Sequence, residues 1–169
     1  RLGIAIVLTA EKRGIAEPAH VRLAVDSMLA LNRRASRVAV ESGVRAMADV
    51  TGFSLMGHGV ELARSSGVAL RISAGRLPVL PGALEYARIG VDTGGGARNR
   101  EALTEAVTIA DDIDEAMTQV LFDPQTSGGL LVVLPVDGGV EFERRMAAAG
   151  IECWRIGEVV EGSGVKVEL

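Results

Sequence analysis

Asp49 stands where chemistry on a bound phosphate could take place. Residues 44–48 before it predict a short strand, and residues 55–63 after it predict a helix. In open α/β sheets ligands bind at the carboxyl ends of the strands, which is where this carboxylate would lie. The first N–H groups of the following helix have no partner within the helix and favour an anion. A Mg²⁺ ion on the carboxylate, with phosphate oxygens on the amides, would suit this arrangement.

The turn after Asp49 also has a simpler interpretation. Thr51, Gly52 and Ser54 are small, so a ligand could approach the backbone closely. Aspartate is equally common as a helix cap or turn former, and these roles need no ligand. From these residues alone the cap is the more economical interpretation, and the metal site remains open.

Residues 122–130, FDPQTSGGL, form a second stretch with unusual turn chemistry. They lead into an apolar strand predicted at residues 130–134. Polar loops beside a buried strand often carry binding residues. A tight turn whose glycines adopt positive φ would have the same composition. A binding role and a structural role therefore both remain open.

Composition limits the class of protein. The 169 residues suit one domain with a sizeable core, in which aliphatic side chains dominate because aromatic residues make up only 3%. The net charge of −4 does not indicate a nucleic-acid surface, and no apolar run approaches the roughly 20 residues of a membrane span. The one cysteine, Cys153, fits a reducing compartment such as the cytoplasm. Because the chain has only this cysteine and two histidines, His20 and His58, an ordinary zinc site is excluded.

The remaining elements predict a single domain over residues 1–169. Apolar runs of strand length lie at residues 2–8, 44–48, 68–72, 130–134, 153–160 and 165–169. Helical spacing is found at residues 18–31, 35–43, 55–63, 82–89, 111–121 and 138–149. We therefore expect an α+β fold (α/β sandwich), with a mixed sheet of about five or six strands and helices packed on it. Residues 162–164 predict a hairpin-like turn between the last two strands.

Residues 90–99 are expected to be a flexible loop. Gly94, Gly95 and Gly96 are followed by Arg98 and Asn99, a composition that could bind phosphate. The stretch matches neither the P-loop pattern nor the dinucleotide fingerprint. A plain surface loop is an equally good interpretation.

The two motifs together resemble a known family. Residues 49–58, DVTGFSLMGH, are similar to the DVTGFGLLGH signature of the selenophosphate synthetase (selenide, water dikinase) family, and residues 122–130 match its FDPQTSGGL segment throughout. Residues 29–35, 78–83 and 156–159 resemble its LNRxA, PLLPGA and IGEV segments. The resemblance covers residues 3–160, in the right order.

This resemblance implies a longer, two-domain parent in the superfamily of aminoimidazole ribonucleotide synthetase. Such a parent converts selenide, ATP and water to selenophosphate, AMP and phosphate with Mg²⁺. The matched segment is the C-terminal domain. The reactive Cys or selenocysteine, the catalytic Lys and most ATP-binding aspartates belong to the family's N-terminal domain, which also forms a homodimer. The chain would then contain no catalytic residue, be inactive alone, and bind neither nucleic acid nor membrane.

The resemblance also assigns roles to individual residues. The family's metal-binding Asp in this domain falls on Asp49, which favours the metal interpretation over the cap. Residues expected to line the wall of the ATP site are Thr51, Gly52, Thr126, Ser127, Gly128 and Gly129. Ser54 for Gly and Met56 for Leu are mild departures from the family pattern. The family's Thr after two glycines is missing at Gly96, which leaves a hydroxyl contact from that loop without support.

Two other classes remain open. The chain could belong to a hydrogenase-maturation or thiamine-phosphate kinase relative, although the DPQTSGG run is not expected there. Selenide-dependent ATP turnover by the full-length parent would discriminate. It could instead be a stand-alone, non-catalytic interaction domain. The codons upstream of Arg1 would decide that question.

Overall fold

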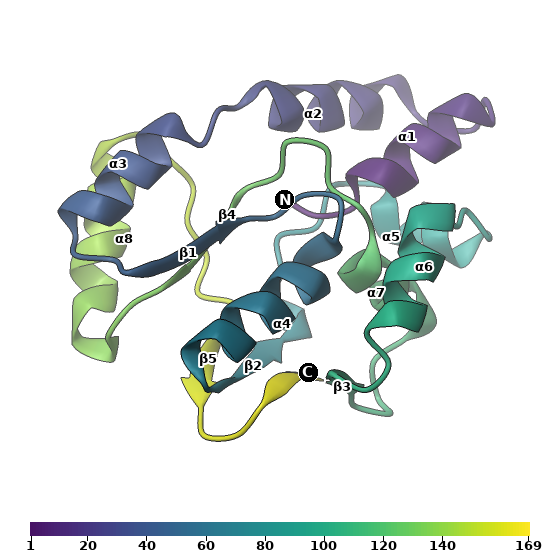
Figure 1. Ribbon diagram of the computed structural model, residues 1–169. Coiled ribbons are helices and arrows are strands. Elements are labelled where there is room, and N and C mark those ends of the chain that lie inside the picture. The colour runs from purple at the N-terminus through teal and green to yellow at the C-terminus, as the bar shows by residue number, and fades with distance from the viewer.

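The computed structural model describes all 169 residues. Three helices precede the first strand, and strands and helices then follow one another to the C-terminus (Figure 1). The helices are α1 (Ile4–Lys12), α2 (Pro18–Leu29), α3 (Arg33–Glu41), α4 (Ser54–Ser66), α5 (Ala83–Arg88), α6 (Gly94–Ala102), α7 (Glu115–Phe122) and α8 (Gly139–Ala148). The strands are β1 (Ala46–Asp49), β2 (Ala69–Ser73), β3 (Val107–Ile109), β4 (Leu130–Val133), β5 (Gly157–Val160) and β6 (Gly164–Glu168). Two 3-10 turns, η1 (Ala74–Arg76) and η2 (Val136–Gly138), complete the set. None of these helices combines the length and the hydrophobicity that a membrane span requires.

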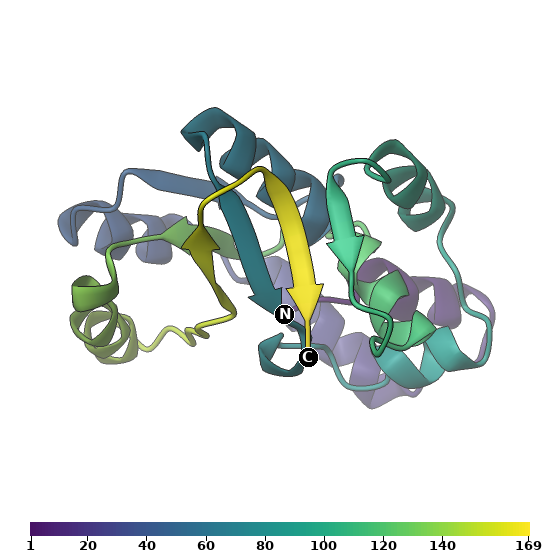
Figure 2. The same ribbon diagram turned by 90° about the horizontal axis from the view of Figure 1, so that it is seen from below.

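The six strands form two sheets. The larger has the order β3-β6-β2-β5, with β2 parallel to β6 and antiparallel to β5, and the smaller is the antiparallel pair β1-β4 (Figure 2). The α+β class, the number of strands and the mixed sheet are thus confirmed, with the strands divided between two sheets. The predicted hairpin at residues 162–164 is wrong, because β2 lies between β5 and β6 and pairs with both.

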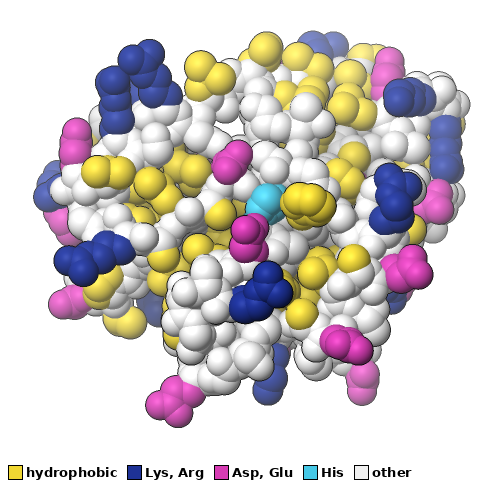
Figure 3. Space-filling view, in the orientation of Figure 1, with side chains coloured by type: hydrophobic (Ala, Val, Ile, Leu, Met, Phe, Trp, Pro, Cys, Tyr) yellow, Lys and Arg dark blue, Asp and Glu magenta, His cyan; other side chains and the backbone are white.

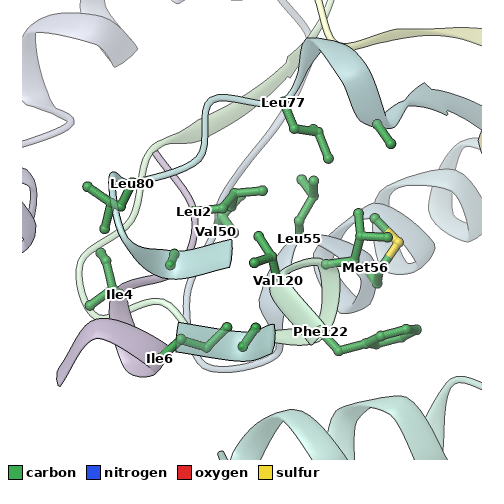
Figure 4. Close-up of a cluster of buried hydrophobic side chains, with 14 of the residues drawn as sticks. Leu2, Ile4, Ile6, Val50, Leu55, Met56, Leu77, Leu80, Val120 and Phe122 are labelled. Carbon is green, nitrogen blue, oxygen red and sulfur yellow. The ribbon is translucent and has the colours of Figure 1, made fainter. Parts of the chain in front are cut away.

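Helix α4 covers one face of the larger sheet, packing on β2 and β6. Leu55 and Met56 of α4 are buried and lie beside Val120 and Phe122 of α7 (Figure 4). The other face of this sheet carries no helix in Figure 2 and bears exposed charged side chains such as Arg71. A smaller cluster, built on Phe142 and Met146, joins α8 to α3. The motif helix α4 is therefore fixed by the main core.

The strand predicted at residues 2–8 is wrong, because residues 4–12 form helix α1. A continuous apolar run is compatible with a buried helix as well as a strand, and Ile4, Ile6 and Val7 are almost completely buried here. The start of this helix is stabilised by side chains from another part of the chain. The N–H of Ile4 donates to Oε1 of Gln125 (3.3 Å) and the N–H of Ala5 to Oδ2 of Asp123 (3.0 Å). Side chains more than a hundred residues away thus satisfy N–H groups that a helix start leaves without partners.

The flexible loop predicted at residues 90–99 is also partly wrong. Helix α6 begins at Gly94, and Thr93 caps it by accepting a hydrogen bond from the N–H of Gly96 (3.1 Å). The Thr93 hydroxyl in turn lies 3.4 Å from Oδ1 of Asp123. Thr93, just before the glycines, therefore supplies a hydroxyl to this segment as the cap of α6. Asp123 links the starts of α1 and α6.

The Asp123 side chain has no solvent-exposed surface. Burial raises the pKa of its carboxyl group from the ordinary value of 3.8 to about 7, against the opposing hydrogen bonds from the Ile6 and Ala5 N–H groups, Gln125 and Thr93. The folded protein therefore binds this proton more tightly than the unfolded chain does. The protonated Asp123 side chain therefore contributes to stability fully below about pH 4, and this contribution is lost as the pH rises through about 7.

We accordingly predict that ionisation of Asp123 lowers the free energy of unfolding by up to about 4 kcal/mol between pH 4 and pH 8. Asp123→Asn keeps an oxygen that can accept the α1 N–H bonds but cannot titrate. Urea unfolding of both proteins across this range should show a steeper fall for the native protein than for the variant. Parallel pH profiles would contradict the assignment.

Candidate functional site

The two sequence motifs meet at one end of the small sheet. Asp49, the last residue of β1, pairs with Leu130, the first residue of β4. Beyond this pair the N–H of Val50 donates to the carbonyl oxygen of Gly129 (2.8 Å), and the N–H of Gln125 donates to that of Thr51 (3.1 Å). The structure therefore brings all of the predicted site residues together, on two adjoining loops at residues 49–52 and 126–129.

Two asparagine side chains brace these loops. The Nδ2 of Asn99, on α6, donates to the carbonyl oxygens of Gly52 (3.0 Å) and Phe122 (3.1 Å), one in each motif. The Nδ2 of Asn32, just before α3, donates to the carbonyl oxygen of Gly128 (2.8 Å). Sequence reasoning did not assign either residue to the site. Asn32 lies in the LNRxA segment and Asn99 follows the glycine run, but neither stretch indicates the carbonyl groups that these side chains bind.

Asp49 does not act as a helix cap. Phe53 occupies the N-cap position of α4, and no side chain makes a capping hydrogen bond there. Asp49 is exposed, and its carboxylate takes part in none of the side-chain hydrogen bonds or ion pairs of the chain. An exposed carboxylate without a partner, at the end of a strand, is available to a ligand.

The side chains around Asp49 alternate between the surface and the core. Val50 is only 5% exposed, whereas Asp49 before it is exposed and Thr51 after it is half-buried, as in the alternation of a strand. In the second loop Asp123 and Gln125 are buried, whereas Thr126 and Ser127 are exposed. The hydroxyl, carboxylate and backbone groups of both loops therefore share one open surface.

The residues present would suit a hard cation held jointly with a ligand. Nowhere do three or more His, Cys, Asp or Glu side chains gather as a metal site. Asp49 is the one charged residue in the two loops, residues 49–52 and 126–129. Mg²⁺ typically takes one or two carboxylates and completes its octahedron with water and phosphate oxygens. The donors fit a shared metal–phosphate site better than an all-protein cage.

Backbone geometry at the site is constrained. Ser127 has φ of 53° and Ser54 has φ of 69°, both in the left-handed region that favours glycine. Ser54 is the position where the resembling family has Gly. The Ser54 side chain is completely buried. Because serine at this φ is less favourable than glycine, Ser54 places backbone strain at the start of α4.

The other candidate groups lie outside the site or support it. Cys153 precedes β5 instead of lying in it, and burial raises the pKa of its thiol, which disfavours a nucleophilic thiolate. His58, on α4, reaches the site directly, because its Nε2 lies 3.1 Å from Oγ1 of Thr51.

Residues 2–169 match the family described as AIR synthase related protein, C-terminal domain, and the chain belongs to this family.

Several curated relatives are selenide, water dikinases. The one from Bordetella bronchiseptica is 41% identical over 168 residues, covering 99% of this chain and 48% of that protein. The one from Escherichia coli O157:H7 is 37% identical over 163 residues, covering 96% of this chain and 46% of that protein. The chain thus spans about half the length of the curated relatives that it matches.

Solved structures share the fold at lower identity. Thiamine-monophosphate kinase from Stenotrophomonas maltophilia superposes with a TM-score of 0.66 and 20% identity, covering 99% of this chain and 47% of that one. The hydrogenase maturation protein HypE from E. coli gives a TM-score of 0.64 and 17% identity, covering 98% and 42%. These similarities show an AIR synthase-like fold.

The two adjoining glycines Gly128 and Gly129 allow a matched test of the site geometry. A Cβ on Gly128 would lie 2.2 Å from the carbonyl oxygen of Val50, whereas one on Gly129 would have no neighbour within 4 Å. We predict that Gly128→Ala lowers the free energy of unfolding by about 1–3 kcal/mol, because the two loops must separate. Gly129→Ala should change it by less than about 0.5 kcal/mol. Equal effects in denaturant titrations would contradict the close approach of the loops.

Proposed function

We propose that residues 1–169 form the C-terminal domain of a two-domain selenide, water dikinase, in which Asp49 holds Mg²⁺ bound to ATP. The observation that carries the proposal is the exposed, unpartnered Asp49 carboxylate beside the 126–129 loop. The 41% identity to a selenide, water dikinase supports the reaction. The parent would phosphorylate selenide and release AMP and phosphate.

The proposed chemistry makes modest demands on this chain. Phosphoryl transfer depends on positioning and on neutralising the phosphate charge, more than on covalent chemistry by the protein. Bound Mg²⁺ would supply much of that neutralisation. Asp49 would fix its position, while Thr51, Gly52 and the residues Thr126, Ser127, Gly128 and Gly129 would line the phosphate wall. Exposed N–H groups of such loops are suited to phosphate oxygens.

The surface around the motifs suits an interface with an N-terminal domain of the same parent. Hydrophobic side chains gather over β1 and β4 and along α2 in Figure 3. Exposed examples near the two loops are Leu29, Leu31, Met47 and Phe53, of which Leu31 is 76% exposed. Exposed apolar patches often mark interaction sites. We infer that the ATP site lies between the two domains, and that the isolated chain is inactive because it supplies no nucleophile.

Other features of the parent follow from the same family assignment. We propose a homodimeric, cytoplasmic enzyme that acts on ATP and selenide. A thiamine-phosphate kinase or a hydrogenase-maturation activity has weaker support, because identity to those proteins is 20% and 17%.

Asp49→Asn in the full-length protein tests the metal role. Asparagine is nearly isosteric and equally able to form a turn or a cap, so the thermal melt should not change. We predict that selenide-dependent ATP turnover falls roughly 100-fold or more, by analogy with the loss of a charge-stabilising group. High Mg²⁺ or Mn²⁺ should restore part of it, since the other ligands remain.

Asp137→Asn is the matched control, since Asp137 is an exposed acid in η2, outside both motif loops. It should leave both turnover and melting unchanged. Unchanged turnover in Asp49→Asn would overturn the proposed ligand.

A further inference from the structure

Thr51 lies beside Asp49 in a geometry that could serve the same ligand. The two residues flank the buried Val50, whose N–H continues the β1–β4 pairing by donating to the carbonyl oxygen of Gly129 (2.8 Å). The alternation of a strand, carried on through Val50, places residues 49 and 51 on one side of the chain, about 6–7 Å apart. A carboxylate and a hydroxyl that converge from this spacing can reach one cation. The Thr51 carbonyl is already engaged with the N–H of Gln125 (3.1 Å), which fixes the backbone of the residue.

The hydroxyl of Thr51 has one protein partner, the Nε2 of His58 at 3.1 Å. The oxygen keeps at least one lone pair for a ligand in either direction of this hydrogen bond. If Nε2 accepts, the Thr51 proton points to the ring and both lone pairs remain available. If Nε2 donates, it takes one lone pair and the other remains available.

Glu61 lies behind the ring of His58. It is one turn further along α4, and its Oε2 is 3.9 Å from Nδ1 of His58. Glu61, His58 and Thr51 thus follow one another in space, and the contact of Nε2 with Oγ1 holds the position of the Thr51 oxygen.

The His58 ring is held for this task. Its side chain is only 12% exposed, and the ring of Phe53 packs against it with centroids 5.9 Å apart. Gly57 makes that packing possible, because a Cβ there would lie 2.8 Å from Cβ of Phe53. Residues of the first motif therefore cooperate to fix one imidazole orientation.

We propose that the Thr51 oxygen is a second ligand to the cation held by Asp49, and that His58 is a positioning residue that holds this oxygen in place. The inference rests on the proposed function for the presence of Mg²⁺ at Asp49. The chemistry is suitable, because hydroxyl oxygens of Ser and Thr bind Mg²⁺ in nucleotide-binding loops. The groups behind a metal ligand commonly orient it.

Binding of Mn²⁺ to the full-length protein, in the presence of a non-hydrolysable ATP analogue, measures this directly by electron paramagnetic resonance. Thr51→Val keeps the β-branched shape and removes the oxygen, and should weaken Mn²⁺ binding roughly 10-fold or more. Thr51→Ser should retain the affinity. Thr108→Val, an exposed threonine on β3 of the larger sheet, is the matched control and should have no effect.

The role of His58 is tested by coupling. His58→Phe preserves a packed ring but loses the contact of Nε2 with Oγ1, and should weaken Mn²⁺ binding roughly 10-fold. The double variant with Thr51→Val should bind no more weakly than Thr51→Val alone, because His58 acts through that hydroxyl. His58→Gln, whose amide can donate or accept this hydrogen bond, should restore part of the affinity. Melting curves of the same variants separate these effects from a loss of folding.

The outcomes distinguish the two proposals. If Asp49→Asn weakens Mn²⁺ binding but Thr51→Val does not, the second ligand is overturned and the proposed function survives. Additive losses from Thr51→Val and His58→Phe would overturn the positioning role. If Asp49→Asn itself binds Mn²⁺ as the native protein does, the proposed metal site fails.

Discussion

The buried carboxylate of Asp123 is the interaction on which the arrangement of the site depends. It accepts hydrogen bonds at the start of α1 and lies within reach of the Thr93 hydroxyl that caps α6. The Gln125 side chain accepts a second hydrogen bond from α1, donated by the N–H of Ile4. The FDPQTSGG stretch therefore has a buried part and an exposed part. Its first half is enclosed and anchors two helices, while Thr126, Ser127 and Gly129 of its second half are exposed where a ligand can reach them.

This anchoring explains how loops without regular structure can present a defined surface. The β1-β4 pair is short, and a two-stranded sheet alone is marginally stable. The loops beyond it are instead held by Asn99, which bridges both motifs, and by Asn32, which binds Gly128. Gly128 permits the close approach of the loops. Because these residues hold the loops in place, the Asp49 carboxylate is not needed for structural hydrogen bonds and stays free.

Patterns in the sequence predicted those elements that depend mainly on residues close to them along the chain. Examples are the α4 helix, the β2 strand, the position of Asp49 at the end of a strand and the position of the FDPQTSGGL loop before a strand. The failures have long-range causes. Helix α1 depends on acceptors from Asp123 and Gln125, and α6 forms despite three glycines of low helix propensity because Thr93 caps it. The bracing roles of Asn32 and Asn99 could not be derived from spacing, since their partners are brought near only by folding.

The central claim is that the Asp49 carboxylate binds the metal ion of a metal–nucleotide complex. Crystals of the full-length protein grown with Mn²⁺ and a non-hydrolysable ATP analogue would test it most directly, because anomalous scattering locates Mn²⁺ independently of the chemical model. The account predicts an anomalous peak about 2.0–2.2 Å from an Asp49 carboxylate oxygen, the distance typical of such small hard cations. A bound nucleotide with all Mn²⁺ peaks beyond the reach of Asp49 would contradict it.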